Sequence, residues 1–160
     1  GAFTPLVSCD IAIAAEEAKF GLSEVNWGII PAGNVTRAVA EKMTSSDALY
    51  YLLSGESFDG RKAAEMRLVY QAVPRAQLRE HTERVAQALL EKNPHVIAAI
   101  KLAYRRVKDM SWDVSEDYLY AKAEETYSTD PEQGRRKGMS QFLDEKSYRP
   151  GLGNYRRDGG

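Results

Sequence analysis

The 160 residues carry 22 basic and 23 acidic side chains, so the net charge is −1 and nothing in it favours nucleic acid or an anionic membrane surface as a partner. No apolar run reaches the roughly 18 residues that a bilayer-spanning helix needs, and no basic-then-apolar leader opens the chain. The single cysteine, Cys9, cannot form an internal disulfide. We therefore expect a cytoplasmic, soluble protein of one domain or part of a larger one.

The composition also argues against a metal site and against cysteine chemistry. His81 and His95 lie far from any cysteine or acidic cluster, so we expect no zinc site and place both on helix surfaces. Cys9 has no histidine near it in the sequence that could activate it. We interpret it as a small packed residue.

The first half of the sequence predicts a mixture of short strands and helices. The predicted elements are a strand over 10–15, a helix from Asn34 to Met43, a helix between Thr44 and Gly55, a helix over 60–66 and a strand over 70–73. Thr44 and Asp47 have the spacing of a capping box, and Gly55 suits the end of that helix. Two short strands rarely form a stable sheet, so we expect its other strands to come from elsewhere.

The second half of the sequence predicts helices. Apolar residues recur at helical spacing after four start points, at Leu78, at Pro94, at Trp112 behind Ser111, and at Pro131. The segment GLGNYRRDGG lacks the strand and third glycine of a nucleotide-binding loop, and we interpret it as a flexible tail. The predicted organisation is therefore an α/β part over 1–73, a helical region over 74–149 and a tail over 150–160.

One carboxylate is out of keeping with its neighbours. Between Lys19 and Arg37 the only charged side chain is Glu24, within FGLSEVNWGIIPAGN. Glutamate is almost never fully buried without a partner, so one interpretation places Glu24 at a solvated turn. The other follows from its apolar surroundings, which would disfavour the charged form and suit the group to exchange protons near neutral pH. The residues alone leave both interpretations open.

Several stretches resemble the enoyl-CoA hydratase/isomerase (crotonase) superfamily. GAFTPLVSCDIAIAAEEAKFGLSE is similar to its pattern of small residues, helix, strand and Phe-Gly, and FGLSEVNWGIIPAGN continues into its Pro-x-Gly turn. AAEMRLV and RRKGMSQFLDEK extend the resemblance over essentially the whole chain. It implies an α/β fold, the C-terminal part of a crotonase-like β-β-α spiral, followed by a helical trimerisation region.

Within the superfamily, EDYLYAK and QFLDEKSYRPGL resemble the 4-hydroxycinnamoyl-CoA (feruloyl-CoA) hydratase/lyase group. That resemblance implies a lyase that hydrates feruloyl-CoA and cleaves the product to vanillin and acetyl-CoA. It implies no cofactor, since coenzyme A is part of the substrate, and it implies a homotrimer or hexamer. The family's chains are longer at the N-terminus, so these residues alone are expected to be incomplete.

The resemblance also implies roles for residues near the start of the chain. Ordinary hydratases of the family use two carboxylates, and here the position of the first holds Thr4, which leaves Glu24 as the single acid/base. The resemblance gives Thr4 a hydrogen bond to water or to the substrate hydroxyl, with a helix-start cap as the alternative. The backbone N–H of Gly1 matches one of the two donors that stabilise the thioester enolate.

Four further residues are implied as binding groups. Tyr120 matches the phenol-binding position, reaching a neighbouring subunit's site, and Trp27 is expected beside the substrate. Phe142 and Lys146, one turn apart on the last helix, match the coenzyme A contacts. Two alternatives to the lyase remain open: a simple enoyl-CoA hydratase or isomerase, and an inactive assembly fragment.

Overall fold

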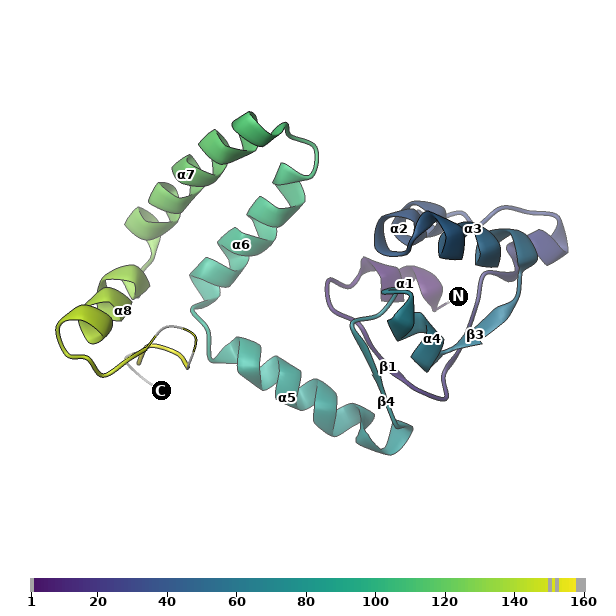
Figure 1. Cartoon of the computed structure of the whole chain (residues 1–160), viewed down its shortest axis with the longest axis horizontal. Helices are drawn as coiled ribbons and strands as arrows, with labels where there is room; N and C mark the ends of the chain where they lie inside the picture. Colours follow the sequence, from purple (N-terminus) through teal and green to yellow (C-terminus); the bar gives the residue numbers. More distant parts are fainter. Residues whose placement is uncertain (1, 150, 152, 158–160) are drawn as a thin grey trace. The chain divides into compact units, whose positions relative to one another are not determined.

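The computed structural model describes residues 2–149, 151 and 153–157, and it divides the chain into two compact units, residues 1–84 and 85–160 (Figure 1). This boundary lies further along the chain than the predicted one after residue 73, because the start of the long helix α5 belongs to the first unit. None of the helices in the described part of the chain combines the length and apolarity needed to cross a membrane.

The N-terminal unit follows the predicted order of elements, with additions. Its elements are α1 (Phe3–Ser8), β1 (Ile13–Ala15), β2 (Lys19–Gly21), the 3₁₀ helix η1 (Ser23–Trp27), α2 (Val35–Lys42), α3 (Ser45–Ser54), β3 (Ser57–Asp59), α4 (Gly60–Glu65), β4 (Gln71–Val73) and the 3₁₀ helix η2 (Arg75–Gln77). The predicted cap at Thr44 is confirmed, since its Oγ1 accepts from the N–H of Asp47 at 3.2 Å, and Gly55 with φ 66° follows the end of α3 as predicted; the Asp47 carboxylate accepts from the Thr44 hydroxyl at 2.8 Å. Asn34 precedes α2 as predicted but makes no side-chain cap.

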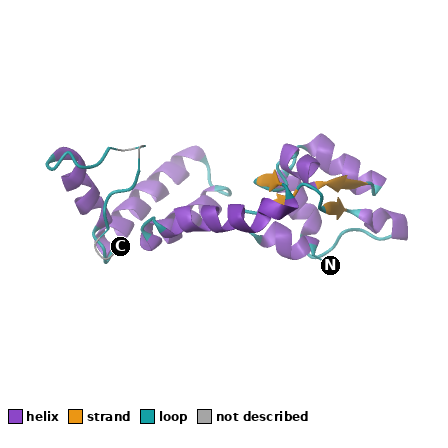
Figure 2. Ribbon diagram, turned by 90° about the horizontal axis from the view of Figure 1, so that it is seen from below, coloured by secondary structure: helices purple, strands orange, loops and turns teal. Residues whose placement is uncertain are grey.

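The strands form two separate pairs, and Figure 2 shows that all of the described strands belong to the N-terminal unit. β1 runs parallel to β4, with Ile13 opposite Gln71 and Ala15 opposite Val73. β2 pairs antiparallel with β3, an element that the sequence did not predict. β1 begins at Ile13 rather than at residue 10, because only the residues opposite β4 have a partner strand.

The core of this unit is built mainly from small and aliphatic side chains, with Phe58 and two methionines, contributed by β1, α2, α3, β3, α4 and the segments next to them. Its largest fully buried members are Leu22, Val39, Leu68 and Val69. The helix α1 adds partly buried side chains to the same core, and α1 packs against α2 while η1 packs against α3. The segments that carry Thr4 and Glu24 are therefore supported by one common core.

The C-terminal unit is helical. It contains the part of α5 (Leu78–Leu90) from Val85 on, then α6 (Pro94–Val107), α7 (Trp112–Thr129) and α8 (Gly134–Leu143), and α6 and α7 run antiparallel side by side (Figure 1). The predicted cap at Asn93 is confirmed, since its Oδ1 accepts from the N–H groups of His95 and Val96. The prediction that the last helix begins at Pro131 is wrong, because Asp130 first accepts the N–H groups of Glu132 and Gly134 in a turn.

One smaller expectation also fails. Cys9 is exposed rather than packed, and its thiol donates to the carbonyl oxygen of Pro5, at 3.4 Å. Residues 154–157 of the segment predicted as a flexible tail are bonded to the rest of their unit. There the Arg157 side chain contacts Glu132, and the Arg156 backbone contacts Gln141.

Candidate active site

Glu24 lies in η1, a short helix that is fixed at both ends. Leu22, immediately before it, is fully buried. At the other end Gly28 has φ 72°, which allows the N–H of Ile29 to donate back to the Glu24 carbonyl at 3.2 Å. The Asn26 side chain donates to the carbonyl of Gly55 at 3.4 Å, which ties η1 to the end of α3.

The carboxylate of Glu24 is the unusual group of this unit. The residue is half-buried, and its Oε2 is fully buried with no hydrogen-bond partner; no other buried side-chain nitrogen or oxygen in the described residues lacks one. An unsatisfied buried polar atom costs roughly 1–3 kcal/mol, and more when charged. A carboxylate oxygen held in this state is an acceptor free to take a proton or a hydrogen bond from a bound molecule. The interpretation of Glu24 as a solvated surface residue is therefore wrong for this oxygen.

Thr4 lies in the first turn of α1 and is exposed. Its Oγ1 is 3.5 Å from the point where a Cβ on Gly33 would stand, so the Pro31–Gly33 turn closes against it. The alternative of a helix-start cap is wrong, because Ala2 occupies the cap position and no side chain caps α1. The hydroxyl is thus not engaged in capping. Gly1, the predicted oxyanion donor, lies outside the described residues.

The two aromatic residues expected at the substrate are both exposed, and they belong to different units. Trp27 ends η1 and is 78% exposed. Tyr120 lies on α7 and is 69% exposed, and with Trp112 and Leu119 it borders an open groove of about 680 Å³. Neither unit alone contains the whole predicted set.

Phe142 and Lys146 are separated by the end of α8. Phe142 lies in its last turn and borders a mostly apolar cavity of about 320 Å³ together with Tyr148 and Tyr155. Lys146 follows the helix, exposed and with a left-handed backbone (φ 54°), so the prediction that both residues share the last helix is wrong. The helix ends early because Ser140 O accepts from the N–H groups of both Asp144 and Glu145.

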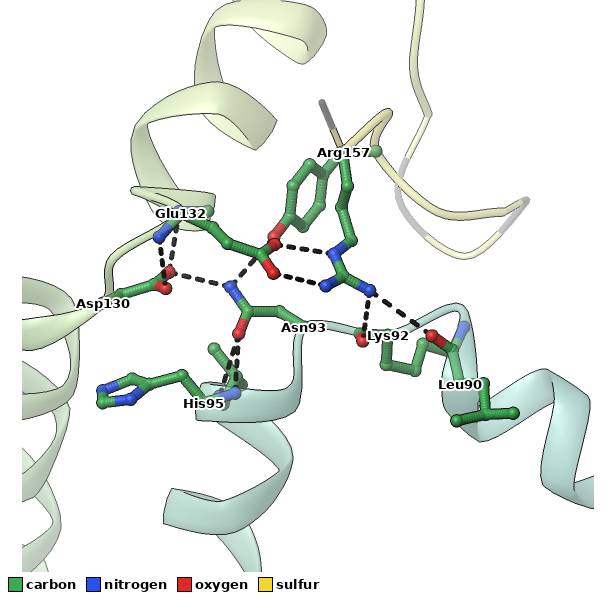
Figure 3. Close-up of polar contacts among 10 residues, drawn as sticks. Leu90, Lys92, Asn93, His95, Asp130, Glu132 and Arg157 are labelled. Atoms are coloured by element: carbon green, nitrogen blue, oxygen red, sulfur yellow. Dashed lines mark hydrogen bonds and ion pairs between the residues drawn. The ribbon is translucent and has the colours of Figure 1, made fainter. Parts of the chain in front are cut away.

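A polar cluster in the C-terminal unit was not predicted (Figure 3). Asn93 Nδ2 donates to Asp130 Oδ2 at 2.8 Å, and the Arg157 guanidinium makes a two-point ion pair with Glu132. Burial acts to raise the pKa of Asp130, but the N–H groups of Gly134 and Glu132 and the Asn93 amide outweigh it and hold that pKa below its usual value. The pKa of Glu132 is lowered chiefly by its hydrogen bonds from Arg157.

The only sequence signal for this cluster was the Asn93-Pro94 helix start. No group of side chains in the described residues is arranged as ligands for a metal ion. The N-terminal unit therefore offers two groups for chemistry. One is the partly buried carboxylate of Glu24 on η1, and the other is the hydroxyl of Thr4, which caps no helix.

Comparison with known proteins agrees with these features. Residues 1–149 match the enoyl-CoA hydratase/isomerase family. The chain is 52% identical over 157 residues to a hydroxycinnamoyl-CoA hydratase-lyase of Pseudomonas fluorescens, an alignment that covers 98% of this chain and 57% of that protein. It is 28% identical over 142 residues to 2,3-dehydroadipyl-CoA hydratase of Escherichia coli K12, covering 87% of this chain and 53% of that protein.

The solved structures show the same architecture. The crystal structure of "Enoyl-CoA hydrates" from Geobacillus kaustophilus HTA426 matches with a TM-score of 0.82 and 27% identity, over 98% of this chain and 56% of that one. The chain thus spans little more than half the length of the relatives it matches. The predicted α/β crotonase fold is confirmed, and the chain belongs to the enoyl-CoA hydratase/isomerase (crotonase) family.

Proposed function

We propose that this protein is a hydroxycinnamoyl-CoA hydratase/lyase that converts feruloyl-CoA and water to vanillin and acetyl-CoA. The observation that carries the proposal is that Glu24 Oε2 is a buried carboxylate oxygen without a hydrogen-bond partner. The position where ordinary hydratases of the family have a second carboxylate holds Thr4 in this chain. The 52% identity to the P. fluorescens hydratase-lyase supports this substrate class.

Glu24 acts as the single acid/base in both halves of the proposed reaction. In the first half it takes a proton from water as the water oxygen adds to the β-carbon, and returns a proton to the α-carbon of the resulting enolate. In the second half it takes the β-hydroxyl proton as the bond between the α- and β-carbons breaks. Vanillin then leaves, and the acetyl-CoA enolate is protonated at carbon. The sum is one substrate plus one water giving two products.

The negative charge on the thioester oxygen must be stabilised in both halves. We assign one donor to the backbone N–H of Gly1, and removing such a donor typically costs about 2.7–4 kcal/mol of barrier. Thr4 offers its free hydroxyl to the water or to the β-hydroxyl. Tyr120 binds the substrate phenol and Trp27 lies beside the substrate, while Phe142 and Lys146 bind coenzyme A.

We further propose that the protein assembles as a homotrimer or hexamer, in which Tyr120 serves a neighbouring subunit's site. The exposed apolar side chains of α7 support this, because monomers rarely leave such a surface open. They are Trp112, Val114, Leu119, Tyr120 and Tyr127. A cytoplasmic location is consistent with the one free thiol, Cys9.

The decisive experiment incubates the full-length protein with feruloyl-CoA and measures vanillin and acetyl-CoA. We expect equal amounts of both from the wild type, and a turnover lower by about 10²–10⁴-fold in Glu24→Gln, the usual contribution of a general acid/base. Glu65→Gln is the matched control, an exposed carboxylate of the same unit paired only with Lys62, and it should leave turnover unchanged.

Two outcomes would contradict the proposal. A hydrated thioester that accumulates without cleavage would identify a simple hydratase. Normal turnover by Glu24→Gln would remove Glu24 from the mechanism.

A further inference from the structure

The C-terminal residues 154–157 are attached to the helices of their unit at several points, and we call this segment the clasp. Arg157 pairs with Glu132 and donates to the carbonyl oxygen of Lys92 at 2.7 Å, so it joins the start of α6 to the turn before α8 (Figure 3). The N–H of Arg156 donates to Gln141 Oε1 at 2.7 Å, and Gln141 Nε2 donates to the Arg156 carbonyl at 2.9 Å. Gln141 is buried, so this second attachment is shielded from water.

Tyr155, which precedes these two arginines, fits against the part of α8 where Gly134 and Gly138 leave space. Its hydroxyl accepts a hydrogen bond from Asn93 Nδ2 at 3.2 Å. A Cβ added to Gly134 would stand 2.2 Å from that hydroxyl oxygen, and one added to Gly138 would contact the ring at 3.6 Å. The glycines, four residues apart, therefore provide the space that the tyrosine occupies.

Phe142 is the next residue along the same face of α8, four positions after Gly138. Phe142 and Tyr155 border the same cavity of about 320 Å³, which is also lined by Val96, Thr126 and Tyr148. A movement of Tyr155 would therefore change the shape of the cavity that Phe142 borders. Phe142 keeps 41% of its surface exposed, which leaves it able to contact a ligand.

We propose that the clasp holds α8 in place and that Tyr155 is thereby a positioning residue for Phe142 in the binding of coenzyme A. Tyr155 acts through α8 and does not touch the substrate. The gain is preorganisation, because a fixed Phe142 loses less conformational freedom when the ligand binds. The inference rests on the proposed function in taking coenzyme A as the ligand, but not on the cleavage step.

The test uses full-length protein and the variants Tyr155→Ala, Tyr155→Phe and Arg157→Lys. Three quantities are measured: the rate of tryptic cleavage after Arg156 and Arg157, the Kd of coenzyme A by calorimetry, and kcat at saturating feruloyl-CoA. Tyr104→Ala is the control, an exposed tyrosine of α6 that contacts Lys108 and does not line the cavity.

We expect Tyr155→Ala to accelerate cleavage and to raise the Kd of coenzyme A, each about tenfold, with kcat unchanged. Tyr155→Phe keeps the ring and should restore a Kd near that of the wild type. Arg157→Lys loses the two-point ion pair and should be intermediate, which keeps the test valid if Tyr155→Ala folds poorly. The control should match the wild type in all three measurements.

An unchanged Kd in Tyr155→Ala, with cleavage fast or slow, would overturn the proposal, as would a wild type that does not bind coenzyme A. A fall in kcat without a change in Kd would overturn it too. Failure of the proposed function would appear differently: the wild type would bind coenzyme A but would not cleave feruloyl-CoA, and the comparison of Kd values would still decide the role of Tyr155.

Discussion

Gly60 lies directly against the main chain of Ala15: a Cβ added to Gly60 would stand 1.9 Å from the Ala15 carbonyl oxygen. The N–H of Gly60 also donates to the carbonyl of Glu16 at 3.0 Å. This contact joins the start of α4 to the segment between β1 and β2, which leads into η1 and Glu24. The obstacle is backbone, so a side chain at position 60 cannot be accommodated by a rotamer change.

Gly60→Ala should therefore destabilise the protein by about 3 kcal/mol or more, at the upper end of the cost of overpacking. Gly21→Ala is the control, because its Cβ would make only ordinary contact with Ser57 Oγ at 3.5 Å. We expect that change to alter stability by about 0.5 kcal/mol or less. Urea denaturation of both variants measures the difference, and equal midpoints would show that the backbone contact is not rigid.

The cap of α3 gives a second prediction. Thr44→Ala removes the side-chain oxygen that accepts from Asp47 N–H, and should lower the free energy of unfolding by about 1 kcal/mol. Thr44→Ser keeps the hydroxyl oxygen and should recover most of that loss. Chemical denaturation checks both variants. A Thr44→Ser variant as unstable as Thr44→Ala would mean that the methyl group, not the cap, matters.

The features that the sequence predicted correctly are mostly local. The caps at Thr44 and Asn93 depend on residues two or three positions away, and both were found. The polar cluster joins Asn93 to Asp130, 37 positions away, and Arg157 to the carbonyl of Lys92, 65 positions away, and no periodicity carries that information. Polar tail residues looked unattached for the same reason.

The candidate site was predictable only in part, again for a physical reason. Glu24 drew attention as an isolated charge among apolar residues, which the sequence shows directly. The burial of one of its oxygens depends on how the folded unit packs around η1, and the sequence does not show this. The end of α8 before Lys146 likewise depends on contacts after the helix, which helical spacing does not reveal.

The unpartnered oxygen of Glu24 gives a third prediction, on stability rather than turnover. Glu24→Gln removes a carboxylate whose Oε2 is buried without a partner, so the free energy of unfolding should stay the same or rise by up to about 1 kcal/mol. Denaturant unfolding at neutral pH measures this, with Glu65→Gln as the exposed control. A loss of more than about 1 kcal/mol would show that the carboxylate is needed for the fold, and the site interpretation would fail.

The polar cluster of the C-terminal unit predicts a dependence of stability on pH. Asp130 and Glu132 both have a lower pKa in the folded protein than in the unfolded chain. For Asp130, burial acts to raise the pKa, but the hydrogen bonds that the carboxylate accepts outweigh it. For Glu132, the hydrogen bonds from Arg157 are the main cause. A lowered folded-state pKa means that, at a pH near these values, the folded protein binds fewer protons than the unfolded chain does. The stabilisation from these two carboxylates is therefore complete above the ordinary carboxyl pKa values of about 4. It is lost as the pH falls through the folded-state pKa values.

We accordingly expect the Tm of the wild type to fall as the pH is lowered from about 5 towards 3. The NMR titration midpoints of the Asp130 and Glu132 carboxyl carbons should lie below the ordinary pKa values of about 3.9 for Asp and 4.3 for Glu. Glu132→Gln should start from a lower Tm at neutral pH and fall less steeply in acid, because it has lost one of the groups that must be protonated. Glu83→Gln, whose partner Arg79 is exposed, is the control and should keep the wild-type slope. If Glu132→Gln kept the same slope as the wild type, the ion pair with Arg157 would not contribute to acid stability, and the clasp would have to be held by its other contacts, among them those to the Lys92 carbonyl, Gln141 and Asn93.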